Sequence, residues 1–260
     1  MEKRITRAKA KIKAARIPYR VPSAEDLPAR VSGVLAVLFL VFNEGYLATG
    51  SDTDPVRHDL ITEATRLTRL IRALMPDDGE VAGLLALMLM TEARRDARVS
   101  GSGELVTLAE QDRGTWDAEL VAEGHRLVRE RLAARAAPGP YQILAAISAV
   151  HTSARDVRDT DWSQVVALYD QLVRLDASPI IALNRAIAVA ELDGPEVALA
   201  AVDSLEHKLA GYHPYHATRA DLLRRLGRSE QSRAAYDKAI ELAGNTAETA
   251  YLTRRRDQLG

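Results

Sequence analysis

The chain has 260 residues and no cysteine, which excludes a disulfide framework and a thiolate metal site. Apolar residues make up 47% and aromatic residues 5%, and the prevalence of Ala and Leu favours helices packed through small side chains. The net charge of −1 conceals an asymmetry, because residues 1–20 sum to +7 and the other 240 residues to −8. A basic arm of this kind suits either contact with a polyanion or a solvated helix end.

The first predicted element is a short basic helix over residues 1–16, which Pro18 and Pro22 end because each removes a backbone donor. We expect residues 1–22 to be a basic tail and linker. The side chains of this tail that would lie near nucleic acid are Arg4, Arg7, Lys9, Lys11 and Lys13.

Residues 23–138 are predicted to form an N-terminal helical subdomain. A turn at Asn43–Tyr46 is expected to end its first helix. No apolar run approaches the roughly 20 residues of a membrane span, so we expect a cytoplasmic protein without membrane contact. The predicted helices cover Ala29–Phe42, His58–Met75, Glu80–Arg95 and Glu119–Arg135.

A set of polar side chains lies on or beside these four helices. Their alternation of carboxylate and guanidinium suits a cleft for a small ligand or a partner, but inter-helix salt bridges and caps are the alternative interpretation. The residues of this candidate cleft are Asn43, Glu44, Glu63, Arg66, Arg94, Arg95, Asp112 and Arg113.

Residues 139–260 show an internal period. The expected turn positions Thr160, Gly194 and Gly227 recur at about the 34-residue period of tetratricopeptide (TPR) helix pairs. A last helix, Ala247–Leu259, would cap the array or present the basic face of Arg254, Arg255 and Arg256 to an acidic segment of a partner. The predicted fold class is therefore all-α, a helical bundle followed by a TPR-like α-solenoid. The candidate residues of a repeat groove are Asn184, Arg185, Tyr215 and Arg219.

Motifs for catalysis are not recognised in the sequence. The six histidines include no i, i+4 pair with an intervening Glu, and Pro214 between His213 and His216 favours a turn over a metal-binding pair. We find no phosphate-binding loop and no nucleophile elbow. We therefore expect no enzymatic activity, no cofactor and no metal.

Several stretches carry a resemblance that covers most of the chain. Residues 4–22 resemble the end of region 4 of an extracytoplasmic-function sigma factor, and the continuation is similar to the TPR-bearing C-terminal extension of one sigma-24-like group. The similar stretches are Leu38–Tyr46, Leu84–Met90, Ala93–Arg95, Leu108–Arg113, Trp116–Asp117, Leu183–Ala186, Tyr212–Tyr215 and Leu226–Arg228.

The resemblance implies a regulatory, protein-interaction extension that acts in transcription initiation. Its implied partners are the sigma core regions or RNA polymerase, with promoter DNA reached only through regions 2 and 4, which this chain largely lacks. An excised C-terminal piece is the favoured interpretation and a stand-alone relative the other. A general TPR peptide-binding scaffold and a small-molecule sensor are the alternative functions. The promoter, the signal and the oligomeric state stay open.

Overall fold

The computed structural model describes Lys11, Ala14, Ala15, Ser23 and residues 25–46, 56–98, 105–134 and 136–259. Within these ranges the regular elements are α-helices and short 3-10 helices, without a strand, so the all-α fold class is confirmed. The basic helix predicted over 1–16 lies outside the described residues except for three positions. Of the five basic side chains expected near nucleic acid, Lys11 is described, and it is exposed.

The chain divides into two compact units, Met1–Ala36 and Val37–Gly260. Helix α2 (Leu27–Tyr46) crosses this division and continues through the four residues where we predicted a turn. The reason is a close helix contact, because a Cβ on Gly45 would lie 2.8 Å from Ile61 Cγ1. Arg57 N–H also donates to the Gly45 carbonyl at 2.8 Å. Gly45 therefore serves the approach of a neighbouring helix and does not end α2.

Helix α2 also corrects the expectation that no apolar segment approaches the length of a membrane span. Its 20 residues have a hydropathy of 1.5, which meets the length and composition of a membrane span. Core helices and signal sequences near an N-terminus meet the same criterion. The expectation was wrong because the predicted helix, Ala29–Phe42, is shorter than α2.

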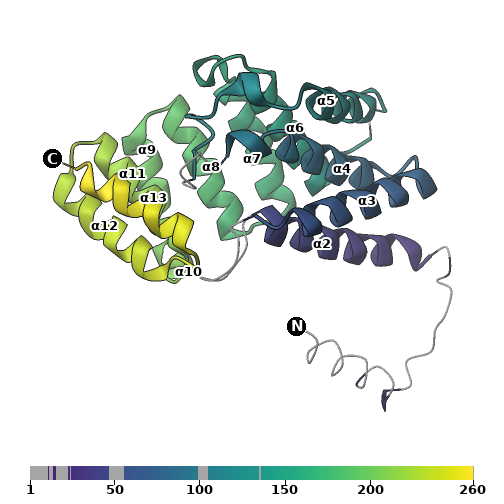
Figure 1. Ribbon diagram of the computed structural model, residues 1–260, viewed down its shortest axis with the longest axis horizontal. Helices are drawn as coiled ribbons and strands as arrows, with labels where there is room; N and C mark the ends of the chain where they lie inside the picture. The colour runs from purple at the N-terminus through teal and green to yellow at the C-terminus, as the bar shows by residue number, and fades with distance from the viewer. Residues whose placement is uncertain are drawn as a thin grey trace. The chain divides into compact units, whose positions relative to one another are not determined.

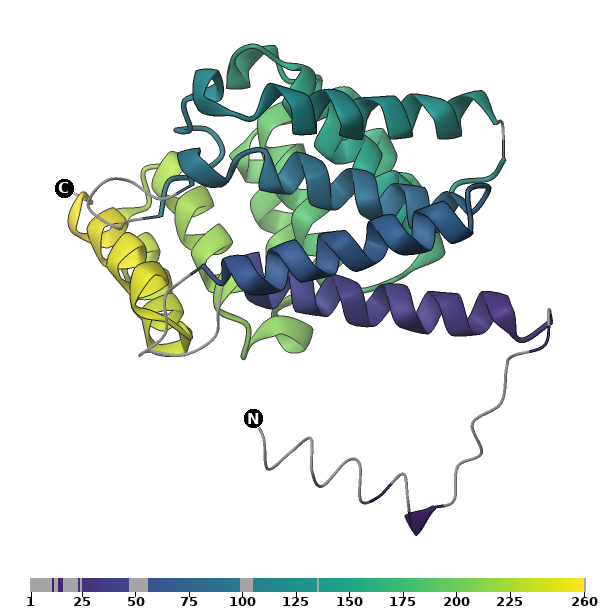
Figure 2. The ribbon, with the colours of Figure 1, turned by 45° about the vertical axis from the view of Figure 1, so that its right-hand side comes forward.

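Helix α4 is the centre of the bundle in the second unit. It lies between α3 and α5 (Figure 2) and also packs against α6. Nine of its residues are buried, so it is apolar on every side. Glu80 joins it to α6, because its carboxylate accepts from Tyr141 N–H at 3.0 Å and Gln142 N–H at 3.2 Å. The bounds are α3 His58–Leu74, α4 Gly79–Glu92, α5 Ala118–Ala133 and α6 Pro140–Ser153.

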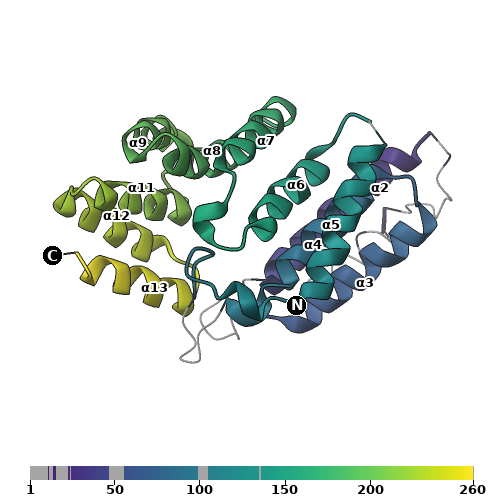
Figure 3. The same ribbon diagram turned by 90° about the horizontal axis from the view of Figure 1, so that it is seen from above.

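The second half of this unit is a series of helix hairpins (Figures 1 and 3). Contacts between sequential helices pair α6 with α7, α8 with α9 and α11 with α12, and α13 packs on α12. A short additional helix, α10 (Glu206–Leu209), follows α9. The other bounds are α7 Trp162–Leu175, α8 Pro179–Leu192, α9 Pro195–Asp203, α11 His213–Arg225, α12 Ser229–Leu242 and α13 Thr246–Asp257.

Two of the three predicted turn positions have the expected backbone. Gly194 (φ 95°) and Gly227 (φ 71°) lie in the left-handed region that favours glycine. Thr160 differs, with φ −66° and a buried side chain at the end of the 3-10 helix η3 (Val157–Asp159). The first hairpin therefore has a longer, structured loop between its helices.

The core of the array runs through several hairpins. It joins Leu183 of α8, Tyr215 and Leu223 of α11, Tyr236 of α12 and Leu252 of α13 in one buried cluster. Helix α6 contacts both α4 and α7, so by packing it belongs to the bundle and to the first hairpin. The predicted division into residues 23–138 and 139–260 stays a prediction.

Candidate functional site

A groove of about 700 Å³ lies along the repeat half and is the candidate site. Three of its helices, α8, α11 and α13, contribute residues at equivalent positions, one repeat apart. The first such set is Asn184, Thr218 and Leu252, and the second is Ile187, Asp221 and Arg255. Repeated positions of successive units therefore face one space, as expected when helical hairpins stack with a constant rotation.

One part of the groove is apolar and aromatic. Trp162, the first residue of α7, is placed there by its N-cap Asp161, whose carboxylate accepts from Gln164 N–H. The rings of His151 and Trp162 form a T-shaped pair with centroids 5.2 Å apart. Ile187 also lines this part and is 41% exposed. Such surfaces bury apolar side chains of a ligand.

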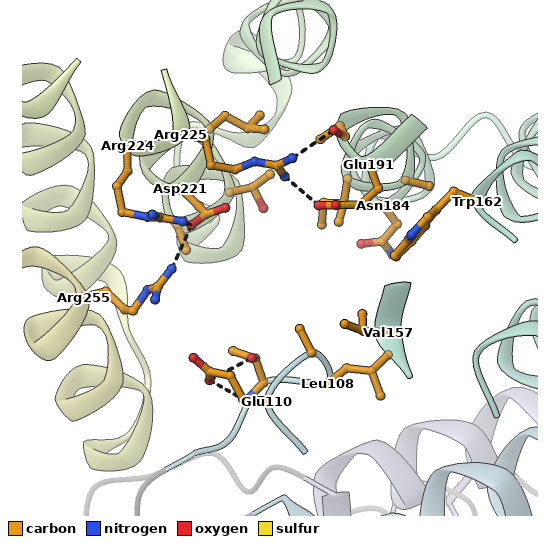
Figure 4. A pocket seen from close by; sticks show the side chains of 18 of the residues that line it. Leu108, Glu110, Val157, Trp162, Asn184, Glu191, Asp221, Arg224, Arg225 and Arg255 are labelled. Atoms are coloured by element: carbon orange, nitrogen blue, oxygen red, sulfur yellow. Dashed lines mark hydrogen bonds and ion pairs between the residues drawn. The ribbon is translucent and has the colours of Figure 1, made fainter. Parts of the chain in front are cut away.

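The other part is charged (Figure 4). Asp221 Oδ1 accepts hydrogen bonds from Arg224 Nη2 at 2.8 Å and from Arg255 Nη2 at 3.0 Å. Arg225 Nη1 donates to Glu191 Oε1 at 2.6 Å, and its Nη2 donates to the Ala190 carbonyl at 3.0 Å. In these ion pairs, three guanidinium groups share two carboxylates.

A wall of the groove comes from outside the repeats. This wall segment, residues 107–111, lines the groove through Thr107, Leu108, Ala109 and Glu110. Hydrogen bonds between its own residues stabilise its turn: Thr107 Oγ1 donates to Glu110 Oε2 at 2.8 Å, and Gln111 N–H donates to the Thr107 carbonyl at 3.1 Å. Among the described residues, no hydrogen bond joins this wall segment to a repeat helix.

Burial controls the protonation of the aromatic and imidazole groups in the groove. Burial, followed by the positive charges of Arg94 and Arg113, lowers the pKa of His151 to about 4. Burial raises the pKa of Tyr169 to about 12. The groove therefore presents a neutral imidazole and neutral phenols at neutral pH.

The four predicted groove residues have different positions. Asn184 lines the groove. The other three do not line it: Arg185 is paired with Asp170 at 2.6 Å, Arg219 with Asp203 at 2.7 Å, and Tyr215 is 1% exposed in the core. Neighbouring helical positions point about 100° apart, so a correct helix does not fix which residue faces inward.

The eight residues of the predicted N-terminal cleft do not line the groove. Glu63 and Arg66 form an exposed pair with each other on α3. Arg95 pairs with Glu92 and Asp96, and Asp112 accepts from Gly114 N–H as a cap. Asn43 is exposed and Glu44 half-buried near the end of α2.

Arg94 and Arg113 do not line the groove, but both lie near His151, which does. Arg113 Nη1 donates to the His151 carbonyl at 2.5 Å and to the Ala154 carbonyl at 2.9 Å, which closes the C-terminal end of α6. Its guanidinium lies 4.8 Å from the Trp116 ring centroid. Arg94 acts on the pKa of both His151 and Arg113, so these groups share one neighbourhood.

The arginines of α13 have intramolecular partners. Arg256 pairs with Asp237 and Asp257, while Arg255 turns into the groove. The first residues of α8, α11 and α13, which are Pro179, His213 and Thr246, recur at the repeat period. Helix α13 therefore takes the place of the first helix of a further unit.

Sequence reasoning missed the charged part and the wall segment. The signal for the charged part was the period itself, because Glu191 and Arg225 are 34 residues apart, and so are Asp221 and Arg255. Opposite charges one repeat apart on the same helix face predict a pair between neighbouring units. The wall segment has no equivalent in the repeats, so the repeat pattern could not predict its place in the site.

Three comparisons place these features among known proteins. A family of unknown function, DUF6596, matches residues 30–133. An uncharacterized protein of Rhizobium meliloti (strain 1021), R00370, is 44% identical over 259 residues, which is 100% of this chain and 61% of that protein. The chain thus spans about three fifths of the length of this relative.

The structural comparison concerns the fold. The crystal structure of TTC0263, a thermophilic TPR protein in Thermus thermophilus, is similar with a TM-score of 0.54. The two share 16% sequence identity, and the similarity covers 88% of this chain and 97% of that one. The TPR-like α-solenoid predicted from the repeat period is confirmed.

Proposed function

We propose that this protein is a helical-repeat scaffold that binds an extended segment of another protein in the groove. The supporting observation is that equivalent positions of α8, α11 and α13 line one space. Its volume of about 700 Å³ falls within the roughly 300–1,000 Å³ of ligand pockets. Stacked helical hairpins commonly present such a concave surface to a peptide or helix.

The groove chemistry suits a peptide. Trp162 and Ile187 offer apolar surface, Asn184 offers an amide with donor and acceptor, and the arginines of α11 and α13 offer charged donors. Apolar contact with a few placed polar groups is the usual composition of a recognition site.

A peptide selection tests the proposal. Purified chain is presented with a displayed library of twelve-residue random peptides, in parallel with Ile187→Glu, Asn184→Ala and the control Arg185→Ala. We expect a shared motif to be enriched on the wild type and on Arg185→Ala, whose side chain points to Asp170 outside the groove. Ile187→Glu should lose the enrichment. No enrichment on the wild type, or equal enrichment on Ile187→Glu, would reject the proposal.

A narrower proposal concerns the identity of the partner. The resemblance to the C-terminal extension of a sigma factor suggests that the groove binds a segment of the sigma core regions or of RNA polymerase. The relative from Rhizobium meliloti is longer than this chain, which covers 61% of its length. The test is to mix this chain with a separately produced region 2 and region 4 core. Absence of binding, or binding that Ile187→Glu leaves unchanged, would refute it.

A further inference from the structure

We propose that the partner segment carries a carboxylate side chain that binds Arg224 and Arg255, and that Glu110 of the wall segment competes with it. This inference rests on the proposed function, because it names the chemistry of the segment that the groove accepts.

The first step is the charge balance around Asp221. One oxygen of this carboxylate accepts from both Arg224 and Arg255, so two guanidinium groups share a single negative charge. The nearby Arg225 does not change the balance, because it is paired with Glu191. A second carboxylate at this point would give Arg224 and Arg255 one negative partner each. Such electrostatic complementarity gives an interface its specificity.

The second step is a donor without an acceptor. Arg255 Nε is buried and, among the described residues, has no hydrogen-bond partner. The Arg255 side chain is 21% exposed and lines the groove together with Tyr236 and Tyr251. A buried N–H without a hydrogen-bond partner destabilises the folded state. A hydrogen bond to a charged acceptor is stronger than one to a neutral acceptor. A carboxylate of a bound segment would supply the missing negative charge to this guanidinium through the part of the side chain that is exposed.

The third step is the wall segment. Figure 4 shows Glu110 on the side of the groove that faces Arg255. Its carboxylate accepts from Thr107 instead of Arg255, yet it is close enough to contribute to the raised pKa of Tyr251. Leu108 of the same turn supplies an apolar side chain to the groove. The wall segment thus presents an acidic and an apolar group side by side, which is the chemistry that we infer for the partner.

Labelled peptides give a direct test. The probe is the synthetic heptapeptide of residues 105–111, Leu-Val-Thr-Leu-Ala-Glu-Gln, and the comparison probe has Gln in place of its Glu. Affinities are measured by fluorescence anisotropy on the full chain, as wild type and as Glu110→Gln. We expect Glu110→Gln to bind the acidic probe several-fold more tightly than the wild type does. It should also prefer the acidic probe over the Gln probe by about tenfold, the effect of one charge-assisted hydrogen bond.

Arginine variants in the Glu110→Gln background identify the receptor. Arg255→Met should abolish the preference for the acidic probe, Arg255→Lys should keep part of it, and the control Arg256→Met should keep all of it. Arg256 is the neighbouring residue but pairs with Asp237 and Asp257. Circular dichroism melting curves of each variant separate loss of binding from loss of fold.

The outcomes distinguish this inference from the proposed function. Equal affinity of the two probes for Glu110→Gln, no binding of either probe, or a preference that survives Arg255→Met in a folded chain would overturn the inference. If the library selection still enriches groove-dependent peptides without acidic residues, the proposed function stands and the inference fails. If the selection enriches nothing, the proposed function itself fails.

Discussion

His151 is the residue whose chemistry is most altered by its surroundings. It is half-buried near the end of α6, with its ring in a T-shaped pair with Trp162 and its carbonyl bound by Arg113. Burial and two nearby guanidinium groups make the imidazolium unfavourable, so the pKa falls to about 4. The neutral ring therefore supports the packing of the groove across the physiological pH range.

This shift predicts a pH dependence of stability. The folded-state pKa lies below the ordinary value of about 6.5, so the unfolded chain binds more protons between these values. We expect His151 to destabilise the fold as the pH falls from 6.5 to 4, by on the order of 2 kcal/mol at pH 4.5. The measurement is urea unfolding at pH 7 and pH 4.5 for the wild type and for His151→Gln.

The variant serves as the internal control, because other titrating groups contribute equally to both chains. The free energy of unfolding of His151→Gln should fall less on acidification than that of the wild type. Parallel pH profiles for the two chains would contradict the low pKa of His151.

At the residue scale the sequence predicted packing positions better than exposed ones. A repeat period places side chains between stacked helices, and Tyr236, Ala220 and Leu223 are buried in this way. Ser232 is also buried, and its hydroxyl donates to the Ala220 carbonyl at 2.8 Å. Packing follows periodicity, whereas the direction of Arg185 or Arg219 depends on which carboxylate lies within reach.

At the scale of elements, the contact of α4 with α6 fixes where the repeat array begins. A Cβ added at Gly83 would lie 2.6 Å from the Gln142 backbone nitrogen, a distance that real Cβ atoms essentially never show. Glu80 caps the first turn of α6 from the same helix. The position of α6, and therefore of His151 at its far end, depends on a glycine and a carboxylate within one turn of each other on α4.

Substitution of Gly83 tests this contact. Gly83→Ala should lower the free energy of unfolding by about 1–3 kcal/mol, because backbone must shift to admit the methyl group. The matched control is Gly33→Ala on α2, where a Cβ meets nothing within 4 Å and helix propensity should raise stability by up to about 1 kcal/mol. Thermal unfolding monitored by circular dichroism measures both. A neutral or stabilising Gly83→Ala would show that α4 and α6 do not approach this closely.

Helix boundaries illustrate what local signals miss. The glycine of Asn43–Tyr46 suggested a turn, but Gly45 permits contact with Ile61 and the helix continues. Gly194 and Gly227 look the same in the sequence and do lie in turns with positive φ. The difference is tertiary, because a glycine can serve either backbone conformation or close packing.

At the scale of the whole repeat half, ion pairs between units follow the same period as the helices. Glu191 with Arg225 and Asp221 with Arg255 each join residues one repeat apart. These pairs lie on the groove side, so the contacts that set the stacking of units also set the charge of the binding surface. The repeat period predicted the array from the sequence. The wall segment lies outside the repeats, so the period could not predict that it lines the groove.

We propose above that the groove binds a segment of a partner protein. This proposal is tested most directly by photo-crosslinking a peptide enriched in the selection, after a benzophenone has been placed on one of its side chains, and mapping the adducts by mass spectrometry. We expect adducts on groove residues such as Trp162, Ile187, Thr218 and Leu252. Adducts concentrated on the exposed surface of α3, or on helix residues that do not line the groove, would contradict it.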